Sequence, residues 1–168
     1  AGQDGELDVV AERIRNFGRR SLAILADVAK KADVERMVQR VTADFGAIDV
    51  LVNNAGGGAG GPFLEMSEDA WDRTIDIILK GTFLCSQAVA RGMVERKRGN
   101  IINISSIEGL RAGGHRASPY NCAKAGVLML TRGLAWELGK YNIRVNAIAP
   151  GGMKTEMIRR QMENPEWM

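Results

Sequence analysis

The sequence predicts an α/β fold in which helices wind over both faces of a parallel sheet. Short, continuous runs of Val, Ile and Leu alternate along the chain with longer segments whose apolar residues recur at helical spacing. Continuous apolar runs are typical of parallel strands that are buried on both faces. Polar residues or glycines follow each run at once, as expected where strands end beside a ligand crevice. We therefore expect one doubly wound domain over residues 1–168.

Four helices and four strands follow from this pattern. Ser67 is expected to cap the third helix, and Ser118 followed by Pro119 is a typical beginning for the fourth. A first helix is expected to end near Gly18. The other predicted elements are strands at 21–26, 48–52, 100–104 and 143–149, and helices at 30–45, 67–95 and 118–138.

The composition is that of a globular protein and argues against several function classes. The net charge of +3 is too small to indicate a nucleic-acid or membrane-surface protein, and Arg96 to Arg98 are interpreted as a solvated helix end. No apolar run is expected to reach the length of a membrane span. The two cysteines, Cys85 and Cys122, have no metal-site spacing with His115 and are expected to be reduced thiols, so the cytoplasm is the expected location.

Unusual residues stand at the predicted carboxyl end of every strand. In a doubly wound sheet these ends share one edge, where ligands bind. Each of the four strands contributes a group, and in order these are Asp27, Asn53 to Gly56, Ser105 with Ser106, and Pro150 with Gly151. The sequence therefore predicts one continuous crevice along this edge.

Tyr120, Lys124 and Ser106 together can carry proton-transfer chemistry. Tyr120 and Lys124 are four residues apart on a predicted helix, so their side chains share a face. An ammonium beside a phenol favours the phenolate and lowers the phenol pKa toward neutrality. The Ser106 hydroxyl stands at a strand end, where it can donate a hydrogen bond to a substrate oxygen. A tyrosine and lysine at this spacing are also common on amphipathic surfaces, so the ordered set of motifs carries the inference.

The ordered motifs resemble those of the classical short-chain dehydrogenase/reductase family. The matching segments are NNAG at 53–56, NISS at 103–106, YNCAK at 120–124 and PGGMKT at 150–155. This resemblance implies a Rossmann-like fold and a homotetramer built through the helices at 67–95 and 118–138. It also implies hydride transfer between NAD or NADP and a secondary alcohol or ketone. Sugars, polyols and 3-oxoacyl thioesters are the candidate substrates.

The resemblance also implies a role for each matching residue. Tyr120 is the expected catalytic acid/base, Lys124 lowers its pKa and holds the nicotinamide ribose, and Ser106 orients the substrate carbonyl. Asp27 and Val28 are expected to border the adenine. The remaining expected cofactor contacts are Asn54, Ala55, Gly56, Pro150, Gly151, Met153 and Thr155. No metal is expected.

The sequence departs from the family pattern in two respects. It lacks the opening strand, glycine-rich turn, helix and second strand, and the closing substrate-covering segment, so we expect it to belong to a longer polypeptide. In addition, Ile78 stands where the family has an asparagine associated with a proton relay to the lysine. Ile78 is interpreted as an extension of the apolar stripe of Trp71, Ile75 and Leu79, in which case the relay is altered or catalysis is weaker. Ile78→Asn is then expected to leave the fold intact and to raise turnover.

Two other functions use the same residues. A non-catalytic binding or scaffold protein of this fold is compatible with Ile78, and an epimerase or dehydratase can use a tyrosine and lysine in the same way. Retention of Ser106, Tyr120 and Lys124 together favours the oxidoreductase. His115, Arg111 and Glu108 lie between Ser106 and Tyr120 and either contact a polar substrate or are surface residues.

Overall fold

The computed structural model describes residues 4–57, 61–112 and 117–152. Three parallel strands and five α-helices make up most of this part of the chain, together with two 3₁₀ turns and one π-helical turn. In chain order the elements are α1 (Asp4–Asn16), α2 (Lys31–Phe45), β1 (Val50–Asn53), η1 (Phe63–Glu65), α3 (Glu68–Ile75), the π turn η2 (Asp76–Lys80), α4 (Gly81–Arg96), β2 (Gly99–Ile104), η3 (Ile107–Gly109), α5 (Ser118–Gly139) and β3 (Ile143–Ile148).

The strands form one parallel sheet in the order β1-β2-β3. The register pairs Asn53 with Asn103 and Ile104 with Ile148, so the carboxyl ends of all three strands meet at the same edge. Parallel neighbours require crossover connections, and here long helices supply them. The predicted parallel α/β class and the last three strands are therefore confirmed, with end positions shifted by one or two residues.

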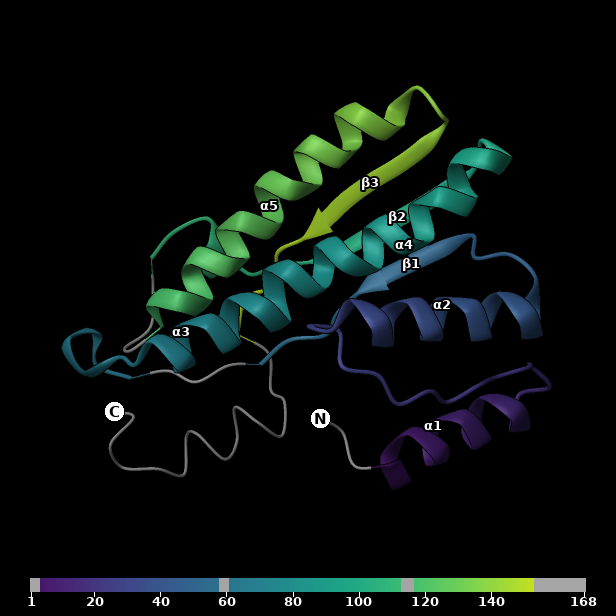
Figure 1. Cartoon of the computed structure of the whole chain (residues 1–168), viewed down its shortest axis with the longest axis horizontal. Coiled ribbons are helices and arrows are strands. Elements are labelled where there is room, and N and C mark those ends of the chain that lie inside the picture. The colour runs from purple at the N-terminus through teal and green to yellow at the C-terminus, as the bar shows by residue number, and fades with distance from the viewer. Residues whose placement is uncertain (1–3, 58–60, 113–116, 153–168) are drawn as a thin grey trace.

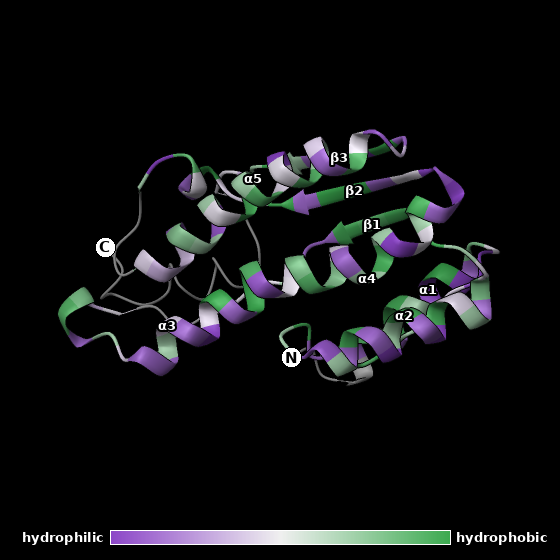
Figure 2. Cartoon of the chain, turned by 45° about the horizontal axis from the view of Figure 1, so that its top comes forward, coloured by the Kyte–Doolittle hydropathy of each residue, from purple (hydrophilic) through white to green (hydrophobic). Residues whose placement is uncertain are grey.

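Helices α2, α4 and α5 lie side by side over the sheet (Figure 1). The main core forms where Val89 and Met93 of α4 pack on Ile101 of β2 and on Ile143 and Val145 of β3. Leu134 and Leu138 of α5 pack against the same core. In Figure 2, α2 shows hydrophobic and hydrophilic residues around its axis, as expected of a helix that buries one side.

The opposite face of the sheet is open among the described residues. Val50, Val52 and Ile148 are each 53% exposed, whereas their neighbours along the strands point into the core. This alternation differs from the prediction that the strands are buried on both faces. Apolar runs were a poor guide here because residues of one strand alternate between two faces with different coverage.

The predicted strand at residues 21–26 is wrong for the described structure. The segment follows α1 and pairs with no described strand, since β1 bonds only to β2. A β-strand requires hydrogen bonds to a neighbouring strand, so this segment is not one. Side chains hold it instead. Ser21 Oγ donates to the Ala11 carbonyl over 2.6 Å, and the Arg20 guanidinium lies 4.6 Å from the centre of the Phe45 ring.

The long helix predicted at 67–95 is confirmed, with an irregularity in the middle. The Ser67 hydroxyl caps it by accepting from the Ala70 N–H over 3.2 Å, and the π turn η2 joins α3 to α4. The helix Glu68–Arg96 contains an 18-residue window with a mean hydropathy of 1.2, so by length and composition alone it could cross a membrane. That corrects the expectation that no run reaches this length. Half of its most apolar window is buried against the protein, as in core helices of soluble proteins.

The beginning of α5 differs by one residue from the prediction. Ala117 occupies the N-cap position and Ser118 is already helical, so no side chain caps this helix. Pro119 stands in the first turn, where its missing N–H leaves no bond unmade. Pro119 alone therefore favours the beginning of the helix here, whereas Ser118 and Pro119 were expected to do so together.

Candidate active site

The polar segments that follow the three strands come together at the carboxyl edge of the sheet. Two backbone hydrogen bonds link the segments after β2 and β3: Ser105 N donates to the Ile148 carbonyl over 2.8 Å, and Ile107 N donates to the Pro150 carbonyl over 3.0 Å. Ser106 therefore lies beside Pro150, as the crevice hypothesis requires.

Ser106 is held by the turn that it begins. It is buried and extended, and its Oγ accepts a hydrogen bond from the Glu108 N–H over 3.1 Å, which caps the 3₁₀ turn η3. A hydroxyl has one hydrogen to donate besides its accepting lone pairs. Because the bond to Glu108 uses a lone pair, the Ser106 hydrogen remains available for an acceptor in the crevice.

Tyr120 and Lys124 lie one turn apart on α5, with the Lys124 Nζ 5.6 Å from the centre of the Tyr120 ring. Lys124 is only 6% exposed, and its Nζ donates to the Ile104 carbonyl at the end of β2 over 2.7 Å. Burial lowers the pKa of Lys124. An ammonium has three N–H donors, so two of them remain for other acceptors at this edge. The arrangement places a partly desolvated cation next to a phenol.

The turn η3 and helix α5 are in backbone contact at this point. A methyl group added at Gly109 would lie 2.7 Å from the Lys124 carbonyl carbon and 2.8 Å from its oxygen. The Lys124 carbonyl also accepts a hydrogen bond from Ser105 Oγ over 2.9 Å. These contacts fix Ser106, which precedes the turn, relative to Tyr120 and Lys124, which are on the helix.

A buried chain of hydrogen bonds crosses the sheet behind the site. The Asn53 amide donates to Ser86 Oγ of α4 over 2.9 Å and to Asn103 Oδ1 of β2 over 2.8 Å. The Asn103 amide donates to Thr131 Oγ1 of α5 over 2.8 Å. This network of hydrogen bonds was not predicted. Period-two alternation along VLVN and IINI was the available signal, since it puts Asn53 and Asn103 on the same face as the core residues.

Ile78 packs into an apolar cluster beside the tyrosine. It is 1% exposed and contacts Ala123 and Val127 of α5, with Tyr120 packed against the same cluster. The interpretation that Ile78 extends the apolar stripe of its helix is therefore confirmed, since Ile75 and Leu79 pack against the same cluster.

The expected adenine-side residues lie near the beginnings of α2 and α4. Asp27 is exposed, and its Oδ1 accepts from the Ala29 N–H over 3.0 Å. Val28 packs in the same apolar cluster as Leu51 of β1, and a methyl group added at Gly81 would lie 2.8 Å from Val28 Cγ2. Residues 27–28 therefore sit on the side of the sheet where β1 ends.

The exposed backbone after β1 and β3 completes the crevice. The residues concerned are Asn54, Ala55, Gly56 and Gly151, all exposed, and the half-buried Pro150. Met153, Thr155 and His115 lie outside the described residues. Within residues 4–57, 61–112 and 117–152 there is no cluster of three His, Cys, Asp or Glu side chains suited to a metal ion.

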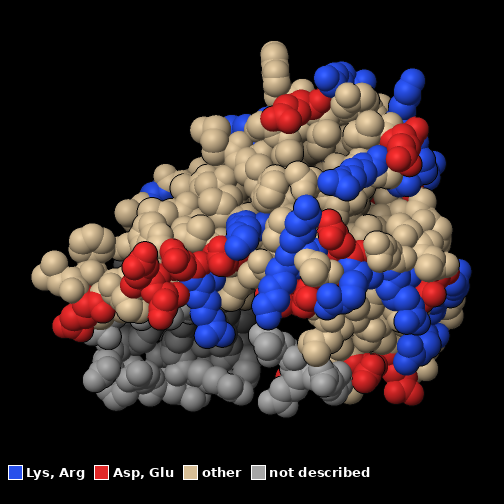
Figure 3. Space-filling model, viewed as in Figure 1, with Lys and Arg blue, Asp and Glu red and all other residues tan. Residues whose placement is uncertain are grey.

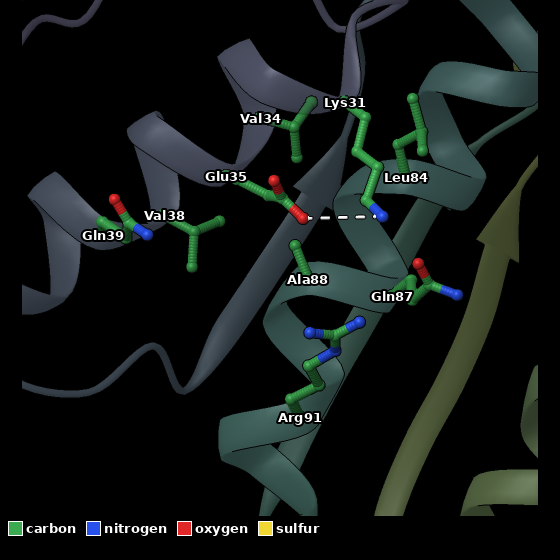
Figure 4. A pocket seen from close by; sticks show the side chains of 9 residues that line it. All are labelled: Lys31, Val34, Glu35, Val38, Gln39, Leu84, Gln87, Ala88 and Arg91. Atoms are coloured by element: carbon green, nitrogen blue, oxygen red, sulfur yellow. Dashed lines mark ion pairs between the residues drawn. The ribbon is translucent and has the colours of Figure 1, made fainter.

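A shallow groove between α2 and α4 lies apart from these residues (Figure 4). Val34 and Leu84 contribute apolar surface, and Lys31 pairs with Glu35 over 3.7 Å at its edge. The groove contains none of the predicted site residues.

Comparisons with known proteins agree with this geometry. A family model described as short chain dehydrogenase matches residues 1–166. The chain is 48% identical over 157 residues to a (2S)-[(R)-hydroxy(phenyl)methyl]succinyl-CoA dehydrogenase subunit of Thauera aromatica, covering 89% of this chain and 62% of that protein. It is 41% identical over 157 residues to the 5-keto-D-gluconate 5-reductase of Escherichia coli K12, covering 94% and 61%. The chain thus spans less than two thirds of the length of these relatives.

Solved structures give the same result. A gluconate 5-dehydrogenase from Burkholderia cenocepacia, crystallised with NADP and tartrate, superposes with a TM-score of 0.89 at 34% identity, covering 99% of this chain and 65% of that one. An NAD⁺-bound xylitol dehydrogenase superposes with a TM-score of 0.89 at 33% identity, covering 95% and 62%. The Rossmann-like fold expected from the motifs is therefore confirmed.

Proposed function

Because the chain belongs to the short-chain dehydrogenase/reductase family, we propose that the protein is an NAD(P)-dependent oxidoreductase acting on a secondary alcohol or ketone. The observation that carries the proposal is the buried Lys124 ammonium beside the Tyr120 ring, at the strand ends where Ser106 also lies. The described relatives and neighbours that act on sugar acids and polyols support this substrate class, and 3-oxoacyl thioesters are the alternative class.

Tyr120 is the proposed acid/base. In the oxidative direction its phenolate takes the proton of the substrate hydroxyl, and in the reductive direction the phenol returns it to the carbonyl oxygen. The neighbouring Lys124 ammonium stabilises the phenolate, since opposite charges at short range favour the ionised form. Ser106 donates its remaining hydrogen to the same substrate oxygen and so opposes the charge that develops on it.

The residues at the carboxyl edge fit a dinucleotide. Lys124 has two N–H donors beyond its bond to Ile104, which suits ribose hydroxyls. Exposed backbone at Asn54 to Gly56 admits close approach of a ligand, and Asp27 with Val28 would border the adenine. By the family pattern, Pro150, Gly151, Met153 and Thr155 would complete the contacts. When bound, the nicotinamide supplies the site that gives or accepts the hydride.

The test is turnover by the full-length protein. Absorbance of the reduced cofactor is followed with NAD⁺ and NADP⁺ on polyols and sugar acids, and with the reduced cofactors on ketones and 3-oxoacyl thioesters. Tyr120→Phe is expected to abolish turnover, whereas Tyr141→Phe, at the other end of α5 and away from the site, is expected to retain it. Equal rates in wild type and Tyr120→Phe would favour a non-catalytic binding protein of this fold.

We also propose a homotetramer in the cytoplasm. The surface over α5 is largely uncharged (Figure 3), and Met129 and Trp136 of this helix are 63% and 89% exposed. Exposed apolar side chains on one helix support burial against another subunit. Both cysteines are free thiols, which supports a reducing compartment. Light scattering is expected to give four chains per particle, and Trp136→Lys is expected to reduce that number.

A further inference from the structure

Helix α5 is joined to strand β2 by hydrogen bonds at two levels. At the level of the site, Lys124 Nζ donates to the Ile104 carbonyl over 2.7 Å, and Ser105 Oγ donates to the Lys124 carbonyl over 2.9 Å. Two turns further along the helix, about 10 Å away, the Asn103 amide donates to Thr131 Oγ1 over 2.8 Å. Attachment at two levels fixes both the direction of the helix and the face that it turns to the strand.

The second level is a polar contact inside an apolar interface. Asn103 and Thr131 are both buried. Ile101 precedes Asn103 on the same face of β2, Val127 precedes Thr131 on α5, and both are fully buried. Apolar contacts have no preferred direction, whereas a hydrogen bond weakens steeply when its donor and acceptor are misaligned. The Asn103–Thr131 bond therefore specifies the register of α5 on β2.

Neither neighbour of Asn103 depends on it for a hydrogen-bond partner. Thr131 Oγ1 also donates to the Val127 carbonyl over 2.7 Å. The Asn53 amide, which donates to Asn103 Oδ1, also donates to Ser86 Oγ over 2.9 Å. A buried amide adds little stability over an apolar side chain of the same shape, but one buried asparagine can fix the register of packed helices. Stability alone therefore does not account for an amide at this position.

Building on the proposed function, we propose that Asn103 is a positioning residue for proton transfer. Through Thr131 it holds α5 in one register on β2. The segment after β2 carries Ser106, and the helix carries Tyr120 and Lys124. The register therefore sets the distance between the serine hydroxyl and the phenol–ammonium pair. Asn103 acts through the helix, because Thr131 lies two turns from Lys124.

The first test is Asn103→Leu in the full-length protein, which removes the bond and leaves each neighbour with a partner. The variant is expected to unfold near the wild-type temperature. Its kcat is expected to fall about tenfold at nearly unchanged substrate KM, because a displaced catalytic group loses rate while every group that touches substrate is kept. Thr131→Ser retains the hydroxyl and is expected to keep the wild-type kcat. A merely structural role for Asn103 would change thermal stability and leave kcat per folded enzyme unchanged.

Thr82→Val is the matched control for Thr131→Val. Both threonines are buried on helices, and both hydroxyls donate to the carbonyl four residues earlier over 2.7 Å. In the described part of the chain, the Thr131 hydroxyl also accepts from a strand side chain and the Thr82 hydroxyl does not. Thr131→Val is therefore expected to lower kcat as Asn103→Leu does, whereas Thr82→Val is expected to keep it.

Hydrogen exchange gives a second readout that needs no substrate. In protein labelled with ¹⁵N-lysine, the Lys124 ammonium signal is identified by its loss in Lys124→Arg. Its exchange with water is expected to be about fivefold faster in Asn103→Leu, since a loose helix opens the bond to Ile104 more often and one hydrogen bond is worth a factor of this size.

An unchanged kcat in folded Asn103→Leu would overturn the positioning role. If that variant does not fold, an unchanged kcat in Thr131→Val would do so. Absence of turnover in the wild type would count against the proposed function instead, and unchanged exchange of the Lys124 ammonium would then overturn the positioning role.

Discussion

Gly109→Ala is expected to lower kcat/KM by displacing a residue of the site, although it removes no catalytic group. The added methyl group would lie 2.7 Å from the Lys124 carbonyl carbon, 2.8 Å from the Lys124 oxygen and 3.0 Å from the Ala125 nitrogen. All three are backbone atoms of α5, which cannot rotate away as a side chain can. Ordinary contact begins near 3.4 Å, so the turn must move by about 0.7 Å from the helix.

That movement carries Ser106 with it. The Gly109 N–H donates to the Ser106 carbonyl over 3.0 Å, and Ser106 Oγ caps the same turn. Displacements near 1 Å in a catalytic group can cost ~10²-fold in rate, so a shift of this size is expected to lower kcat/KM by about tenfold or more. Overpacking of this kind also costs roughly 1–3 kcal/mol of stability.

Gly139→Ala is the matched control. Gly139 stands at the end of α5 that is far from Tyr120 and Lys124, and a methyl group added there meets no atom within 4 Å. Because no group of the site is displaced, kcat/KM is expected to stay at the wild-type level. Steady-state kinetics and urea unfolding of both variants make the comparison. Wild-type kcat/KM in Gly109→Ala, with the fold intact, would refute the claim that this contact sets the position of Ser106.

Three further predictions concern buried groups. Thr131→Val leaves the Asn103 amide without its acceptor and is expected to cost ~1–3 kcal/mol in urea unfolding; a loss below ~0.5 kcal/mol would mean that the bond is not formed in solution. The exposed thiol Cys122 is expected to react with a disulfide reagent in the folded protein, whereas Cys85, whose pKa burial raises, is expected to react only after unfolding; Cys122→Ser should therefore abolish the fast phase. Burial lowers the pKa of Lys124, so the folded state binds fewer protons than the unfolded state between that pKa and 10.5. The buried ammonium therefore lowers the free energy of unfolding by its full amount below the folded-state pKa, and this effect fades as the pH rises toward 10.5. The gain in unfolding free energy of Lys124→Met over wild type should shrink across that pH range. A gain that does not depend on pH would contradict the lowered pKa.

The sequence predicted those elements whose pattern is local. Helical spacing gave α2 and α5 within a residue or two, and Ser67 marked the beginning of the long helix by its own hydrogen bond. The segment 21–26 failed for a physical reason: an apolar run becomes a strand only when another strand pairs with it. No residue inside the segment reports whether such a partner is present.

The residues of the site were likewise predictable only where local spacing or strand ends placed them. Tyr120 and Lys124 share a helix face by spacing alone, and parallel strands bring Ser106 to the same edge. The hydrogen bond from Asn53 to Asn103 spans fifty residues and depends on register, which no local pattern reveals. The π turn at Ile78 was equally hidden, because an apolar stripe looks the same in a helix with one inserted residue.

Three glycines set the distances between the parts of the site, and their order of importance follows from what each one touches. Gly109 meets backbone of α5, Gly81 meets the branched side chain of Val28, and Gly126 meets the end of the Leu79 side chain. A flexible leucine can change rotamer, whereas backbone cannot move without its helix. We therefore expect Gly126→Ala to lower kcat/KM less than Gly109→Ala, although the closest contacts, 2.8 Å and 2.7 Å, are almost equal. Equal losses in the two variants would mean that contact distance alone, and not the freedom of the contacted atom, decides the outcome.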